Sequence, residues 1–90
     1  MKPVFEYNDY RTYLCDYYTH KKSSNPYFSY RMFARMAQYK SPSFFKEIAD
    51  GQKRLSVWMA ERFGKAMRLS EEETLWLEKL VVNERTELLN

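Results

Sequence analysis

The sequence predicts an all-α fold, a compact bundle of about five helices that contains a helix-turn-helix within one domain spanning residues 1–90. Three observations support this class. Apolar side chains recur with the spacing of a helix face, most of these stretches begin at a Ser or Asp that can cap a helix, and no run alternates as a strand does. The expected helices cover residues 9–22, 29–38, 41–50, 56–67 and 70–88.

The first of these helices has the most regular apolar face in the chain. Asn8 or Asp9 is expected to cap it, and Lys21 and Lys22 suit the negative end of its dipole. We expect the apolar face to lie in the core, with the tyrosine hydroxyls at its rim. The face consists of Tyr10, Tyr13, Leu14, Tyr17 and Tyr18.

The second helix is short and is expected to begin with Ser29 as its N-cap. Its periodicity separates an apolar side from a polar side. The residues expected to face inward are Phe33, Ala34 and Ala37, and those expected to face outward are Arg31, Arg35 and Gln38.

The third helix is predicted over residues 41–50. Ser41 is the expected N-cap and Pro42 occupies the first helical position, so Ser41→Ala should cost about 1 kcal/mol. Gly51 is expected to end the helix, and residues 52–54 form an exposed basic loop. The helix should turn Phe44, Phe45 and Ile48 inward and Ser43, Lys46 and Asp50 outward.

The fourth helix should begin at a Ser56 cap and contribute apolar bulk to the core. Gly64 lies inside it at a cost of about 1 kcal/mol relative to Ala, and close packing against another helix would explain its presence. The apolar residues expected to supply the bulk are Val57, Trp58, Ala60, Phe63 and Met67.

The fifth helix opens with a capping box, in which Ser70 precedes three glutamates at the positive end of the helix. Residues 75–82 are apolar almost all round, which is more than packing on one side requires. We therefore expect a second copy of the chain, or a further domain, to cover part of this segment. The predicted dimer or interdomain contacts are Leu75, Trp76, Leu80 and Val81.

Composition and charge narrow the function. Residues 1–69 hold 13 Lys and Arg against 6 Asp and Glu, whereas residues 70–90 hold 2 against 6, so the positive charge lies in the part that contains the helix pair. No stretch is long and apolar enough to cross a membrane, no signal peptide is evident, and the single cysteine cannot form an internal disulfide. We expect a cytoplasmic protein that does not associate with membranes.

Catalytic chemistry is poorly represented in the sequence. His20 is the only histidine and lies beside two lysines, Cys15 lies beside an aspartate, and no glycine-rich phosphate loop is present. The expectation is a protein that is not an enzyme and that holds no cofactor and no metal.

The helix pair, by contrast, has the parts of a surface for double-stranded DNA. A short helix can enter the major groove with its first turn forward, and basic residues around it can hold the phosphates. The expected base contacts are Ser41, Ser43 and Lys46, and the expected backbone contacts are Arg31, Arg35, Lys40, Lys53 and Arg54.

The run FARMAQYKSPSFFKEIADG, with the basic loop and AERFGKAMRLSEEE after it, resembles the repressor-like helix-turn-helix domains of the phage-repressor and Xre type. More narrowly, FEYxDYRxYLxDYY, NPxFSYRxFAR and SPSFFK resemble the N-terminal region of a family of uncharacterised bacterial proteins described as predicted transcriptional regulators. The resemblance implies that residues 41–50 form the recognition helix of a bacterial regulator that binds DNA as a dimer. Tyr30 stands where the repressor-like pattern has a phosphate-binding Gln, and Gln38 where its turn often has Gly.

Two other functions are compatible with the same residues. The apolar girdle of the last helix, together with Glu47 and Asp50 on the recognition helix, is consistent with a helical protein-interaction or dimerisation module that does not bind DNA. Binding of single-stranded RNA would require Tyr17, Tyr18 or Tyr39 to face solvent.

Overall fold

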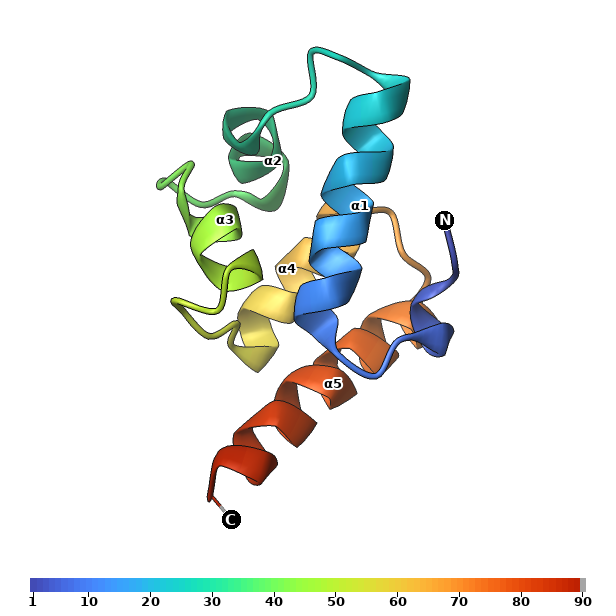
Figure 1. Cartoon of the computed structure of the whole chain (residues 1–90), viewed down its shortest axis with the longest axis vertical. Coiled ribbons are helices and arrows are strands. Elements are labelled where there is room, and N and C mark those ends of the chain that lie inside the picture. The colour runs from blue at the N-terminus through green and yellow to red at the C-terminus, as the bar shows by residue number, and fades with distance from the viewer. Residues whose placement is uncertain (90) are drawn as a thin grey trace.

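A computed structural model describes the backbone of residues 1–89 and the side chains of residues 1–84 (Figure 1). Within residues 1–89 every regular element is a helix, which confirms the all-α class. None of these helices combines the length and the apolar character that crossing a membrane requires. The elements are the short 3-10 helix η1 (Val4–Glu6) and the α-helices α1 (Tyr10–Ser24), α2 (Tyr30–Ala37), α3 (Phe44–Ala49), α4 (Val57–Ala66) and α5 (Glu71–Leu89).

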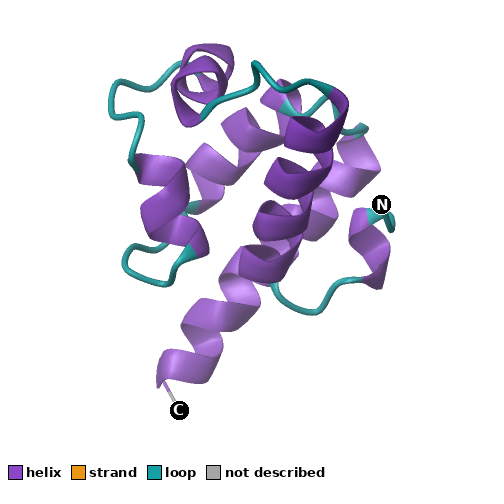
Figure 2. Cartoon of the chain, turned by 45° about the horizontal axis from the view of Figure 1, so that its top comes forward, coloured by secondary structure: helices purple, strands orange, loops and turns teal. Residues whose placement is uncertain are grey.

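Helix α4 lies partly behind α1 in Figure 1. It packs most extensively against α5 and also contacts α2. Helix α3 packs against both α1 and α2, and η1 packs against α5. Figure 2 shows α2 and α3 joined by a loop at one edge of the molecule, while the C-terminal end of α5 projects away from the other helices.

Three phenylalanines hold the helix pair against α4. Phe33 of α2 lies with its ring centroid 5.0 Å from that of Phe45 of α3 and 5.0 Å from that of Phe63 of α4, both edge to face. Phe45 and Phe63 stack with their ring centroids 5.8 Å apart. Because all three rings are essentially free of solvent contact, they place α2, α3 and α4 around one aromatic centre.

Most predicted helix caps are confirmed. Asp9, Ser29 and Ser56 each accept a hydrogen bond from a backbone amide in the first turn of the helix that follows. At α5 the capping box closes in both directions, since the Ser70 amide donates to Glu73 at 2.7 Å and the Glu73 amide donates to the Ser70 hydroxyl at 3.1 Å. These side chains satisfy amides that the helices themselves leave unpaired.

The predicted start of α3 is wrong by three residues. The helix begins at Phe44, and Ser41 does not cap it. The Ser41 carbonyl instead closes a turn by accepting from the Phe44 amide at 3.1 Å, while the Ser41 hydroxyl lies 3.1 Å from that of Ser43. Pro42 therefore belongs to a turn, and the expected cost of Ser41→Ala loses its basis.

Three helices end with a residue in the left-handed region. One of these residues is Gly51 (φ 86°), which was predicted to end α3. Gln38 (φ 61°) and Arg68 (φ 60°) adopt the same conformation at the ends of α2 and α4, although they carry a Cβ. In each case an amide just beyond the helix donates to a carbonyl five residues earlier, which satisfies part of the helix end. The three bonds join Tyr39 to Ala34, Gln52 to Glu47 and Leu69 to Gly64.

The prediction for the apolar face of α4 is partly wrong. Phe63 and Ala60 are buried, but Trp58 is 59% exposed, and the buried residue beside it is Met59. Trp58 lies on the solvent side with Arg62, whose guanidinium carbon is 5.1 Å from the centre of its ring. The sequence signal for this outward position is the i, i+4 spacing between Trp58 and the cation Arg62.

Candidate nucleic-acid interface

The predicted base-contacting side chains gather at the turn between α2 and α3. Ser41 and Ser43 belong to the turn, Lys46 lies in the first half of α3, and all three are exposed. The opposite side of α3 carries the buried Phe45 and Ile48, so the helix has one face for the core and one for solvent.

The polar groups of this face are already engaged with one another. The Ser43 hydroxyl donates to Glu47 at 2.9 Å, and the same carboxylate pairs with Lys53 at 3.3 Å. The hydrogen bond from Ser43 lowers the pKa of Glu47 below its ordinary value, and Lys53 adds to this effect. Lys46 pairs with Asp50 one turn later at 3.4 Å. Two of the six predicted cationic contacts therefore neutralise carboxylates of the chain itself.

The other four predicted cations lie free on the surface. Arg31 and Arg35 are exposed on α2, Lys40 is exposed in the turn, and Arg54 is exposed in the loop after α3. None of them has an ion-pair partner among the side chains of residues 1–84. They are consequently available to an external anion without first breaking an internal pair.

Tyr30 does not take the role that a Gln has at this position in the repressor-like pattern. Its ring is half-buried and stacks on that of Tyr18 with a centroid distance of 4.2 Å. It also packs against the ring of Phe45. In the turn, the Gln38 carbonyl accepts a hydrogen bond from Arg62 at 2.9 Å. The departure at Tyr30 thus serves the packing of the helix pair, whereas the bond at position 38 involves only the backbone.

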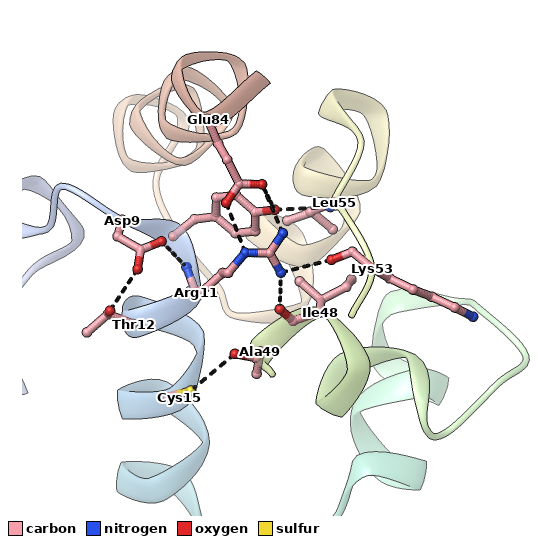
Figure 3. A network of polar contacts seen from close by, with 10 residues as sticks. Asp9, Arg11, Thr12, Cys15, Ile48, Ala49, Lys53, Leu55 and Glu84 are labelled. Carbon is pink, nitrogen blue, oxygen red and sulfur yellow. Dashed lines mark hydrogen bonds and ion pairs between the residues drawn. The ribbon is translucent and has the colours of Figure 1, made fainter. Parts of the chain in front are cut away.

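Arg11 is the residue of this region that sequence reasoning missed (Figure 3). Its Nε and Nη2 each donate to one oxygen of Glu84 in α5, both at 2.9 Å. Its Nη1 donates to the carbonyl of Ile48 at the end of α3 and, at 2.8 Å, to the carbonyl of Lys53 in the basic loop. The one local signal was an arginine directly after the first tyrosine of an otherwise apolar helix face. No spacing of residues in the sequence indicates that Glu84, 73 residues later, is the partner of Arg11.

The predicted dimer or interdomain contacts are only partly available. Leu80 and Val81 are buried within the chain itself, so their assignment to a partner surface is wrong. Helix α5 packs against α4 and η1, which accounts for the buried part of the apolar girdle without a second chain, whereas Val82 is 46% exposed. Trp76 is half-buried and donates its indole N–H to the Tyr7 carbonyl at 3.3 Å, whereas Leu75 is 58% exposed.

The tyrosines required for stacking on single-stranded RNA do not face solvent. Tyr17 is buried, and Tyr18 and Tyr39 are half-buried in the aromatic core. The hydroxyls of Tyr17 and Tyr39 are buried and have no hydrogen-bond partner among the described residues. The prediction that the tyrosine hydroxyls of the first helix lie at the rim of the core is therefore wrong for Tyr17. Burial accordingly raises the pKa of Tyr17 to about 12.

The residues considered for catalysis lie apart from one another. Cys15 is exposed on α1, and its thiol faces the Ala49 carbonyl at 3.9 Å. Partial burial, with nearby carboxylates, raises the pKa of this thiol, which disfavours the thiolate. His20 is exposed on the same helix. No three His, Cys, Asp or Glu side chains gather as a metal site in the described part of the chain.

Comparison of the chain with models of protein families, with curated proteins and with solved structures gives no significant match.

Proposed function

We propose that this chain is a sequence-specific DNA-binding domain of a bacterial transcriptional regulator, with α3 and the turn before it in the major groove of double-stranded DNA. The observation that carries the proposal is the division of α3 into two faces. Phe45 and Ile48 fix the helix to the core, while Ser43 and Lys46 are exposed, as are the unpaired cations of α2 and of the neighbouring loops.

The contacts divide into two kinds. Ser41, Ser43 and Lys46 would meet base edges, where a lysine favours the acceptors of guanine. The phosphate contacts would come from the cations of α2, the turn and the basic loop, which carry no sequence information themselves. These are Arg31, Arg35, Lys40, Lys53 and Arg54.

The internal ion pairs on this face do not prevent binding. Lys46 and Asp50 are exposed side chains on one helix, and such surface pairs contribute at most about 1 kcal/mol. A guanine acceptor can therefore displace Asp50 from Lys46, and a phosphate can displace Glu47 from Lys53. The salt dependence reports whether the pair between Lys53 and Glu47 opens, because the slope of log K against log salt is about −3.6 for four phosphate contacts and about −4.5 for five.

Selection of bound duplexes from a random DNA pool at two salt concentrations tests the proposal. We expect enrichment of one sequence at the higher salt, and loss of affinity in the triple variant Lys46→Ala, Lys53→Ala, Arg54→Ala. A control with the same loss of charge outside the helix pair is Lys2→Ala, Lys65→Ala, Lys79→Ala. If the first variant binds as well as the control, the proposal is refuted.

A helical interaction or dimerisation module without DNA binding is the second candidate. It is favoured by Leu75, which is 58% exposed beside a groove of about 460 Å³ between α4 and α5, whose wall also holds Glu61, Glu71 and Glu78. Light scattering across a range of protein concentrations would support this function if self-association disappears in Leu75→Glu and no duplex is bound.

A further inference from the structure

Arg11 joins three parts of the fold that lie far apart in the sequence. It belongs to α1, its carboxylate partner Glu84 belongs to α5, and the two carbonyls that it binds belong to the end of α3 and to the basic loop. A guanidinium has donors in a fixed planar fork, so binding both oxygens of Glu84 sets the direction of its remaining donors. Glu84 thereby orients the donors that hold Ile48 and Lys53.

Tyr10 forms a second connection between the same elements. Its hydroxyl donates to Glu84 at 2.8 Å and accepts from the Leu55 amide at 3.3 Å. Residues 48–55 are consequently linked to Glu84 of α5 at both ends of the segment. Arg11 makes the link through the carbonyls of Ile48 and Lys53, and Tyr10 makes it through the Leu55 amide. Lys53 and Arg54, two of the proposed phosphate contacts, belong to this segment.

Helix α3 depends on such external support because it has only six residues. A helix this short has little stability of its own and must be held by tertiary contacts. The buried Phe45 and Ile48 hold its inner face. At its C-terminal end the Ile48 carbonyl accepts from the Gly51 amide at 3.1 Å and also from Arg11, so Arg11 adds a second donor from outside the helix.

We propose that Arg11 is a positioning residue for the DNA contact, through which Glu84 of α5 holds the C-terminal end of α3 and the basic loop in the arrangement that meets the phosphates. This inference rests on the proposed function. If Glu84 moves away, the guanidinium of Arg11 loses its counter-ion although its side chain is only 18% exposed. The guanidinium then turns towards water and releases the carbonyls of Ile48 and Lys53. Movements of the second half of α5 are thereby transmitted to the DNA-binding face.

Two variants and one control test this coupling in the whole chain. Glu84→Gln keeps the size of the side chain but removes its charge, and Arg11→Lys keeps the charge but removes the fork. The control Glu61→Gln removes the same charge from an exposed pair with Lys65 on α4. The readouts are native-state amide hydrogen exchange, followed residue by residue by NMR, and affinity for a duplex chosen by selection.

We expect exchange at the Leu55 amide to accelerate at least tenfold in Glu84→Gln and Arg11→Lys, while the Ala37 amide in α2 exchanges at its original rate. Duplex affinity should fall about tenfold in both variants. In Glu84→Gln this loss of affinity opposes the general effect of removing one negative charge, which strengthens attraction to DNA. The control should show neither change.

Two results would overturn the positioning role. One is an unchanged exchange rate at Leu55 in both variants. The other is equal acceleration at Leu55 and Ala37, because that shows a loss of global stability instead of release of the loop. If the unmodified protein binds no duplex, the proposed function fails, while local acceleration at Leu55 still supports the tie between α5 and the loop.

Discussion

Gly64→Ala should destabilise the protein, although alanine is the better helix former. The substitution gains about 1 kcal/mol of helix propensity. A Cβ built on Gly64 would lie 2.5 Å from the Oγ1, 2.7 Å from the Cγ2 and 3.1 Å from the Cβ of Thr74 in α5. Rotation of the threonine cannot clear both γ atoms because the residue is branched at Cβ. Helices α4 and α5 must then move apart, at an overpacking cost of about 1–3 kcal/mol or more.

The net loss, which is the overpacking cost less the propensity gain, is up to about 2 kcal/mol and is measurable by urea unfolding followed by circular dichroism. In a Thr74→Ala background only the Cβ contact at 3.1 Å remains, so Gly64→Ala should become close to neutral. The double-mutant cycle would then give a coupling of about 1 kcal/mol or more. A stabilising effect of Gly64→Ala in the unmodified protein would refute the close contact between the two helices.

Two further changes follow from the backbone and from the buried tyrosines. Gln38→Gly and Arg68→Gly should each raise the free energy of unfolding by about 0.5–1 kcal/mol. Glycine relieves the strain of the left-handed conformation, and this gain exceeds the cost of the entropy that glycine adds to the unfolded chain. A loss of stability in urea unfolding would contradict this. Burial raises the pKa values of Tyr10, Tyr13 and Tyr17 to about 12. The folded state therefore holds these protons more tightly, and stability that is complete below pH of about 10 should be lost as pH rises towards about 12, by up to about 1.4 kcal/mol per unit for each tyrosine. Urea unfolding between pH of about 9 and 11 measures this loss, and a flat profile would contradict it.

The parts of the fold that could be predicted from sequence are those set by neighbouring residues. A serine or aspartate before a periodic stretch places a helix start, and the spacing of Tyr10, Tyr13 and Tyr17 places a buried face. Gly64 could be predicted to lie in a close helix contact because its propensity cost needs a compensating reason. Each of these inferences needs only a few residues of local sequence.

The errors arose where two local possibilities compete or where a distant partner decides. Ser41 can cap a helix or close a turn, and the bond between Ser43 and Glu47 favours the later start. The apolar residues 75–82 suggested an external partner, but α5 packs on η1 and α4, and Leu80 and Val81 are buried within the chain itself. No local rule anticipates that the first residues of the chain pack on the last helix.

The two departures from the repressor-like pattern change which groups the proposed interface can use. Tyr30 faces the core against Tyr18, so the start of α2 offers no amide side chain to a phosphate, and Arg31 beside it is the group left to make that contact. Gln38 reaches the left-handed conformation without glycine, and the bond from Arg62 to its carbonyl holds the turn to α4. The angle between α2 and α3 therefore depends on α4 through Arg62, while the far end of α3 depends on α5 through Arg11. The proposed binding face therefore relies on the packing of the whole bundle, because α3 alone is too short to set its own orientation.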